Sequence, residues 1–223
     1  VASCSSSVRV RDESGGKEHA VADGAIAPAT LRKANGRVAV DFRLGVPDVS
    51  RFPRDAWLRS LRSGLSSMTT ADLGYGDARG TDRLRSALAG YLGRVRGVVA
   101  SAERVVVTSG YLQGLTLVCR ALSAAGARRI AFEDPSDLEP RVVAGRAGLE
   151  VVPVAVDASG LLVQELATKG VDAVVVTPAH QFPTGAVLVA DRRAALTDFL
   201  RRRDAIAIED DYDAEYRYDR APV

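Results

Sequence analysis

Apolar positions follow a helical period over the stretch that begins at Thr81. Thr81 and Asp82 are residues that favour the start of a helix, and Gly97 favours its end. Apolar side chains between them recur at spacings of three and four residues, namely Leu84, Ala87, Leu88, Tyr91, Leu92 and Val95. This spacing is typical of an amphipathic helix that turns one face toward a core, so the pattern predicts a helix here.

Short β-branched runs alternate with helical stretches over the rest of the chain. The predicted strands are 104–109, 130–132, 151–156, 173–177 and 205–208, and the predicted helices are 110–122, 139–147 and 191–203. Strands that are apolar throughout and separated by helices are buried on both faces, as in βαβ units. The pattern therefore predicts an α/β fold, a mainly parallel sheet flanked by helices.

The N-terminal part of the chain has a different character. Residues 1–38 are rich in Ser, Gly, Ala and charge and show no period, so we expect a flexible linker or tail. Within residues 39–80, a loop leads into a helix with one apolar face, formed by Trp57, Leu58 and Leu61. We expect residues 39–80 to pack onto a large domain formed by residues 81–223.

Composition and charge exclude several classes of protein. The 223 residues are 47% hydrophobic, enough to bury a core, and 30 basic residues against 28 acidic ones leave a net charge of +2. This balance is unlike the basic stripe of a nucleic-acid binder. No apolar run approaches the roughly 20 residues of a membrane span. With two distant cysteines and no signal-peptide core, we expect a cytoplasmic chain without a membrane partner, trimmed or incomplete because it begins with Val1.

Ligands of open parallel sheets bind beyond the carboxyl ends of the strands. At one such end, residues 108–113 pass from a predicted strand through Gly110 into a helix. The free N–H groups and positive dipole end of a helix start can bind phosphate. The same residues also fit an ordinary strand-to-helix turn, which is common in α/β folds.

A second strand end, residues 208–213, runs directly into four carboxylates around Tyr212. A carboxylate there can pair with a protonated pyridine nitrogen, and a phenol can hydrogen-bond a ring hydroxyl. A solvated acidic loop fits the same residues. A divalent-metal site is a third reading, but neither a histidine nor a second acidic cluster supports it, so no metal is predicted.

Two further segments carry polar or glycine-rich turns. Residues 177–185 follow a predicted strand and hold His180, which taken alone fits a structural histidine as well as a functional one. Residues 73–80 have glycines at the spacing G-x-G-x-x-x-G with no preceding strand, so they do not form a dinucleotide-binding loop.

Five segments together resemble a known family. YGDARG, TSGYLQ, EDPSD, TPAHQFPTG and IEDDYDAEYRYD are similar, in order and spacing, to the aminotransferase-like large domain of fold-type-I proteins that depend on pyridoxal 5'-phosphate (PLP), over residues 40–223. HQFPTG and EDDYDAEYRYD resemble the MocR/GabR subfamily of GntR-type transcriptional regulators. In that subfamily a winged helix-turn-helix domain is joined by a linker to an aminotransferase-like effector domain, whereas ordinary aminotransferases typically carry NPTG at the turn.

The resemblance implies PLP as cofactor and a position for its phosphate. Backbone N–H groups of Gly110, Tyr111 and Leu112 would bind the phosphate, with Ser109 beside them. Tyr75 matches a tyrosine that reaches the phosphate of the partner subunit, which implies a homodimer.

The resemblance also implies which residues contact the cofactor ring. Asp210 would pair with the pyridine nitrogen and Tyr212 would contact the ring hydroxyl, while His180 would lie near the ring. Because Asp211 is adjacent to Asp210, the resemblance leaves open which of the two pairs with the pyridine nitrogen. The ligand sensed would be a small amino-containing effector or amino acid, and DNA would be contacted only through a domain absent from this chain.

The sequence departs from the family pattern at several points. Asp137 stands where an aromatic commonly stacks on the ring, and Leu112 stands where the subfamily often has Gln. The family's Schiff-base lysine and its substrate-binding arginine would lie past Val223, and the only lysines present are Lys17, Lys33 and Lys169. Transamination by this chain is therefore not predicted, because it cannot hold the cofactor covalently.

Three hypotheses follow. The first is an effector-sensing, PLP-binding fragment of a MocR/GabR-like regulator. The second is a fragment of a catalytic PLP-dependent aminotransferase, and the third is an α/β interaction domain with a degenerate site. A helix-turn-helix reading frame upstream would separate the first from the second.

Overall fold

The computed structural model describes residues 49–213, which belong to two compact units, Val1–Ala78 and Arg79–Val223. The expected linker over residues 1–38 and the segment 214–223 lie outside the described residues. In the first unit, the helix α1 (Arg54–Ser66) lies between two 3-10 turns, Val49–Arg51 and Ala71–Leu73.

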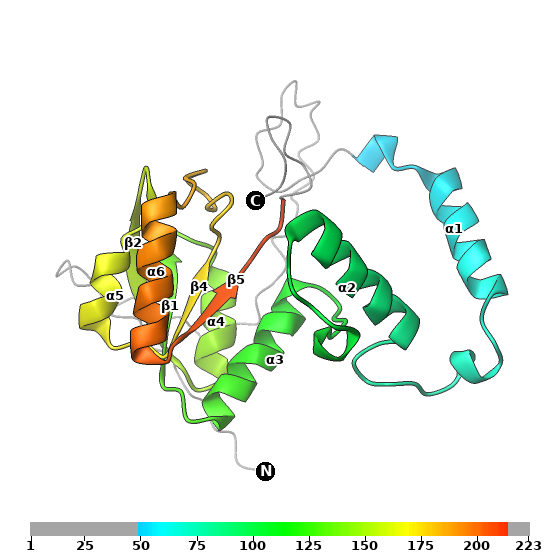
Figure 1. The fold of residues 1–223 in the computed structure, drawn as a ribbon, viewed down its shortest axis with the longest axis horizontal. Coiled ribbons are helices and arrows are strands. Elements are labelled where there is room, and N and C mark those ends of the chain that lie inside the picture. Colours follow the sequence, from blue (N-terminus) through cyan, green and yellow to red (C-terminus); the bar gives the residue numbers. More distant parts are fainter. Residues whose placement is uncertain (1–48, 214–223) are drawn as a thin grey trace, which may run out of the picture. The chain divides into compact units, whose positions relative to one another are not determined.

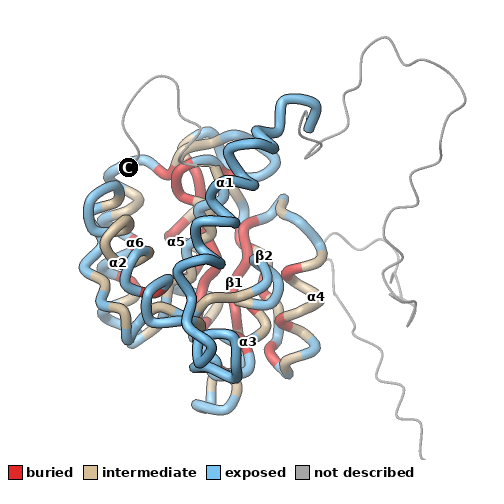
Figure 2. Tube along the Cα trace, turned by 90° about the vertical axis from the view of Figure 1, so that its right-hand side faces the viewer, coloured by how far each residue is buried: buried red, intermediate tan, exposed pale blue. Residues whose placement is uncertain are grey.

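The helix predicted within residues 39–80 is present as α1, but its apolar face is exposed to solvent. Trp57, Leu58, Leu61 and Leu65 are each more than half exposed, and the helix has no buried residue (Figure 2). The expected packing of residues 39–80 onto the large domain stays a prediction.

The second unit is built on a five-stranded sheet in the order β3-β2-β1-β4-β5 (Figure 1). The strands are β1 (Arg129–Asp134), β2 (Glu150–Asp157), β3 (Gly160–Leu161), β4 (Ala173–Val176) and β5 (Ile206–Glu209). All pairs are parallel except β2 with β3. The mainly parallel α/β sheet that the sequence predicts is therefore confirmed.

Helices cover both faces of this sheet (Figure 1), namely α3 (Tyr111–Ala124), α4 (Leu138–Arg146), α5 (Val163–Lys169) and α6 (Ala190–Arg203). On one face Ile130 and Phe132 of β1 pack in a cluster with α3 and α4. Between them along the strand, Ala131 belongs to the other cluster, with α5 and α6. Because successive side chains are buried on opposite faces, the strands are apolar at every position and not only at every second one.

Capping residues set the ends of α2 (Asp82–Arg96) as the sequence predicts. The Thr81 side chain accepts a hydrogen bond from the Leu84 N–H, and Gly97 ends the helix in the left-handed region at φ 64°. The segments α5 and β3 are not in the sequence-based prediction, because seven and two residues are too few to display a period.

The strand predicted over residues 104–109 is wrong. A 3-10 turn (Ala102–Arg104) precedes an extended segment in which the Val107 N–H donates to the Arg79 carbonyl at 2.8 Å. Val106 is half exposed there. A β-branched run becomes a strand only where a neighbouring strand offers hydrogen bonds, and the described residues place none beside it.

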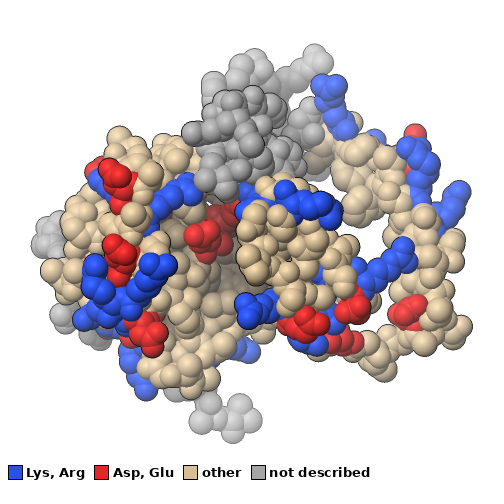
Figure 3. All heavy atoms as spheres, viewed as in Figure 1, with Lys and Arg blue, Asp and Glu red and all other residues tan. Residues whose placement is uncertain are grey.

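The charge of the described surface is mixed. Over α6, basic and acidic side chains lie side by side (Figure 3), in agreement with the near balance of the composition. Within residues 49–213 we find no helix long and apolar enough to cross a bilayer.

Candidate functional site at the strand ends

The carboxyl ends of β1, β4 and β5 meet at one edge of the sheet. These strands are neighbours and parallel, and the Asp210 N–H continues the ladder by donating to the Val176 carbonyl at 2.9 Å. Thr177, the first residue past β4, donates from its hydroxyl to Glu133 of β1 at 2.6 Å. The strand ends at Thr177 and Glu209 thus lie together, as expected, whereas Ser109, the third predicted strand end, follows no strand. The convergence of all three on one pocket stays a prediction.

The start of α3 lies at the same edge and is open. Gly110 has φ 101°, a backbone conformation that glycine adopts without strain, and it turns the chain into the helix. The helix has no side-chain cap and no acidic residue in its first turn. The Gln113 side chain instead accepts a hydrogen bond from the Ser109 N–H. An uncapped helix start of this kind offers backbone donors and a positive dipole end to an anion.

Tyr111, at the helix start, interacts electrostatically with the Asp210 carboxyl of the loop after β5. Burial raises the pKa of Tyr111 well above its ordinary value, and the charge of Asp210 adds to this. Burial likewise raises the pKa of Asp210, the neighbouring Asp211 raises it further, and the Tyr111 hydrogen bond opposes the shift. A desolvated carboxylate gains from pairing with a cationic donor, so Asp210 is suited to a protonated ring nitrogen.

Asp211 has a different partner. Its carboxylate pairs with Arg96 of α2 at 2.7 Å, and the Arg96 side chain is only 7% exposed. Adjacent residues of an extended segment point in opposite directions, which separates the two carboxylates. Asp210 and Asp211 therefore have different neighbours, Tyr111 and Arg96, and the assignment of Asp210 to the pyridine nitrogen stays a prediction.

Tyr212 and His180 lie against each other. The Tyr212 hydroxyl donates to the His180 carbonyl at 2.9 Å, and the two rings stack at 6.4 Å with 16° between their planes. His180 Nδ1 lies 2.5 Å from an Asp213 carboxylate oxygen. Burial raises the pKa of Tyr212, followed by the charge of Asp213. The loop after β5 and the turn after β4 are therefore held together by these contacts.

The sequence-based prediction missed two buried polar residues, Glu133 and Gln181, which are 3% and 2% exposed. Both lie inside segments that it quotes, EDPSD and TPAHQFPTG. The position of Glu133 at the end of an apolar strand was an available signal, whereas Gln181 lies five residues past β4, and only burial distinguishes the two from solvated neighbours.

The remaining predicted residues have separate positions. Tyr75 lies fully exposed in the first unit, so its contact with a partner subunit stays a prediction. Asp137 caps α4 by accepting from the Glu139 N–H. Lys169, the only lysine among residues 49–213, donates to the Pro153 carbonyl at 2.8 Å and pairs with Glu165. These partners hold its amine away from the strand ends described above.

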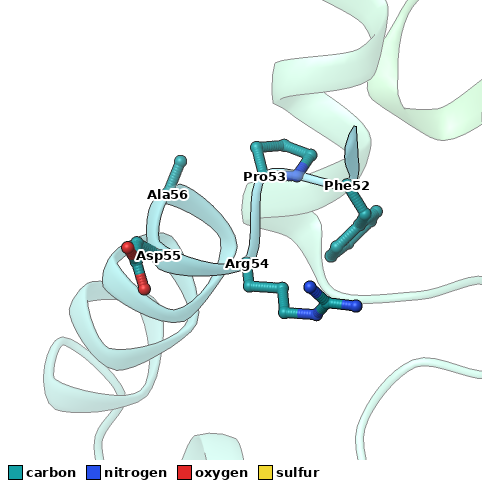
Figure 4. A pocket seen from close by; sticks show the side chains of 5 residues that line it. All are labelled: Phe52, Pro53, Arg54, Asp55 and Ala56. Atoms are coloured by element: carbon teal, nitrogen blue, oxygen red, sulfur yellow. The ribbon is translucent and has the colours of Figure 1, made fainter. Parts of the chain in front are cut away.

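Two hollows are found among residues 49–213. One is lined by residues at the start of α1, Phe52 to Ala56 (Figure 4), and the other by residues near Ser101. Neither is lined by a predicted site residue, and the pocket expected at the strand ends stays a prediction. The described residues also hold no group of three or more potential metal ligands.

Comparisons with known proteins agree with this architecture. The family Aminotransferase class I and II matches residues 40–215. The HTH-type pyridoxine biosynthesis transcriptional regulator PdxR of Corynebacterium glutamicum is 36% identical over 179 residues, covering 80% of this chain and 38% of that protein. The probable rhizopine catabolism regulatory protein MocR of Rhizobium meliloti is 31% identical over 184 residues, covering 82% of this chain and 37% of that protein.

A solved enzyme shares the fold. Kynurenine aminotransferase of Pyrococcus horikoshii, in complex with PMP, KYN and KYA, superposes with a TM-score of 0.67 at 27% identity, covering 80% of this chain and 46% of that one. The chain thus spans less than half the length of these relatives. The fold and the cofactor class that the sequence predicts, PLP-dependent fold type I, are confirmed at the level of the family. The chain belongs to the class I and II aminotransferase family.

Proposed function

We propose that this chain is the PLP-binding, effector-sensing part of a MocR/GabR-like transcriptional regulator. Its similarity to two HTH-type regulators over about four fifths of its length supports this. The observation that carries the proposal is the uncapped start of α3, whose Tyr111 interacts electrostatically with Asp210. An anion site and a carboxylate for a cationic nitrogen thereby lie at one edge of the sheet.

The residues present fit the cofactor. Backbone N–H groups of Gly110, Tyr111 and Leu112 would bind the phosphate, with Ser109 beside them, because an open helix start selects for an anion. Asp210 would hold the proton on the pyridine nitrogen. When bound, the cofactor supplies an aldehyde that reacts reversibly with a primary amine, which is why the effector would be a small amine or amino acid.

Residues of the loop after β5 and of the turn after β4 would orient the cofactor ring. Tyr212 would turn from the His180 carbonyl to the ring hydroxyl, and His180, stacked on Tyr212, would lie near the ring. Tyr75 would reach the phosphate bound by a second copy, so the working form would be a homodimer.

The cofactor would be held noncovalently by these residues alone. Lys169 is engaged with Pro153 and Glu165, and it lies at the end of α5 that precedes β4, opposite the carboxyl ends of the strands. DNA would be contacted through a winged helix-turn-helix outside this chain. The 223-residue chain should therefore not retard a promoter fragment specifically at physiological salt, and joining it to the upstream domain should restore retardation.

A catalytic aminotransferase is the second candidate, favoured by the shared fold with kynurenine aminotransferase. The HQFPTG turn, where ordinary aminotransferases typically carry NPTG, favours the regulator instead. Joining the chain to its upstream reading frame and assaying both amino transfer and promoter binding separates the two.

Titration of PLP into the 223-residue chain, followed by absorbance, tests the cofactor site. Asp210→Ala should loosen PLP by about ten-fold to a hundred-fold, because a charge-assisted hydrogen bond contributes roughly 1.5 to 3 kcal/mol. Asp211→Ala is the matched control and should leave PLP affinity nearly unchanged while destabilising the contact with Arg96. Equal loss in both variants would contradict the register. A borohydride-reduced adduct on Lys169 would contradict noncovalent binding.

A further inference from the structure

Glu133 is a buried carboxylate without a function in the site described so far. It lies at the carboxyl end of the central strand β1 and is 3% exposed. One carboxylate oxygen accepts two hydrogen bonds from Thr177, from the backbone N–H at 3.1 Å and from the hydroxyl at 2.6 Å. The main-chain donor fixes the first residue beyond β4, so the carboxylate bridges two neighbouring strand ends.

Among residues 49–213, no ion pair is found for this carboxylate. The guanidinium of Arg141 instead donates to the Glu133 main-chain carbonyl at 2.6 Å and pairs with the Asp134 carboxylate at 2.7 Å. The groups that act on the Glu133 carboxylate are Thr177, Gln181 and the carboxylate of Asp210. Burial raises the pKa of Glu133, the hydrogen bonds from Thr177 and Gln181 lower it, and the charge of Asp210 raises it. Two carboxylates therefore share this edge of the sheet.

Gln181 extends the bridge into the turn. Its amide nitrogen donates to the Pro135 carbonyl at 2.8 Å, and its amide oxygen accepts from the Thr184 hydroxyl at 2.5 Å. The end of β1 and the loop after it are thus joined to the turn after β4 at two points, by Glu133 to Thr177 and by Pro135 to Gln181, while the contact of Gln181 with Thr184 lies within the turn itself. This turn holds His180, whose carbonyl accepts from Tyr212.

We propose that Glu133 is a positioning residue of the cofactor site. Its buried carboxylate holds the turn from Thr177 to Gly185 in place, and this turn carries the His180 carbonyl that accepts from Tyr212. That His180 and Tyr212 contact a bound cofactor rests on the proposed function.

Two substitutions separate hydrogen bonding from charge. Glu133→Gln keeps an oxygen that accepts from Thr177 but removes the charge, whereas Glu133→Ala removes both. In the cofactor-free chain, hydrogen exchange followed by NMR should find the Thr177 amide protected in wild type and in Glu133→Gln, and exposed in Glu133→Ala. Unchanged protection in Glu133→Ala would overturn the role of Glu133 in the turn.

PLP titration connects the turn to the cofactor site. Glu133→Ala should loosen PLP by roughly three-fold to ten-fold, because the turn that carries His180 is no longer held, whereas Glu133→Gln should bind PLP as wild type does. Equal loss in the two variants would overturn the positioning role. If wild type binds no PLP, the proposed function fails, while the hydrogen exchange of the Thr177 amide still decides the role of Glu133 in the turn.

Discussion

The starts of α3 and α4 differ although both follow directly on the turns at the same edge of the sheet. Asp137 caps α4 and Glu139 adds a second carboxylate in its first turn, so the dipole end of this helix is neutralised within the chain. At α3, Gly110 has no side chain to cap the helix and no acidic residue follows in the first turn. Of the two, only α3 leaves its donors available to an external anion.

This contrast separates a helix start that stabilises the fold from one that is available for binding. A cap satisfies N–H groups and contributes stability, whereas an open start leaves donors that a ligand can use. Four predictions test the contrast, from the largest expected effect to the smallest.

Gly110→Ala should have the largest effect, because φ 101° strains any residue with a Cβ. We expect a loss of about 1 to 2 kcal/mol in the free energy of unfolding and PLP binding loosened by about ten-fold as the helix start moves. Gly126→Ala is the control, since Gly126 has the same φ of 101° and also open space around it. Denaturant unfolding and PLP titration of both variants measure this, and equal loss of PLP affinity in the control would contradict it.

Asp137→Ala should act on stability alone. Loss of the α4 cap should cost about 0.5 to 2 kcal/mol in the free energy of unfolding, with PLP affinity unchanged, whereas Asp137→Asn should retain most of the cap. Urea unfolding of the three proteins provides the comparison. A clear loss of PLP affinity in Asp137→Ala would mean that α4 also contributes to the site.

Asp210→Asn should make the protein more stable at neutral pH, by less than about 1 kcal/mol. Burial raises the pKa of Asp210 in the folded chain, so ionisation costs stability as pH rises from the ordinary value of 3.8 through the folded value. The variant lacks this cost, and its unfolding should depend less on pH over that interval. Thermal unfolding between pH 4 and pH 8 checks the sign, and a variant less stable than wild type at pH 7 would refute it.

Tyr111→Phe should have the smallest effect on PLP, less than about three-fold, because the contact with the phosphate uses backbone donors and a neutral hydrogen bond contributes about 1 kcal/mol or less. Leu112→Ala serves as its control at the next position. A ten-fold loss on titration of Tyr111→Phe would show that the phenol itself holds the cofactor.

Much of the fold is determined locally and was predictable. The spacing of Leu84, Leu88 and Tyr91 and the capping residues Thr81 and Gly97 specify α2 whatever surrounds it, because a helix closes its hydrogen bonds within itself. The apolar runs of β1 and β4 likewise predict strands buried on both faces. The segments that hold Gly110 and Asp210 could be singled out because each lies at the end of a predicted strand, although only the second of these strands is present, as β5. The role of Asp210 itself came from the family resemblance.

Tertiary structure alone decided the rest. Residues 104–109 have the composition of a strand but lack a neighbour that supplies hydrogen bonds, and a strand depends on that neighbour. Asp210 and Asp211 are identical in composition and adjacent, and only the positions of Tyr111 and Arg96 distinguish them. In the sequence, Glu133 is one more charged residue in an acidic segment. Only the fold brings the hydroxyl of Thr177, 44 residues further along, within 2.6 Å of its carboxylate. Charge and hydrogen bonding act through space, so distant partners remain hidden until the chain folds.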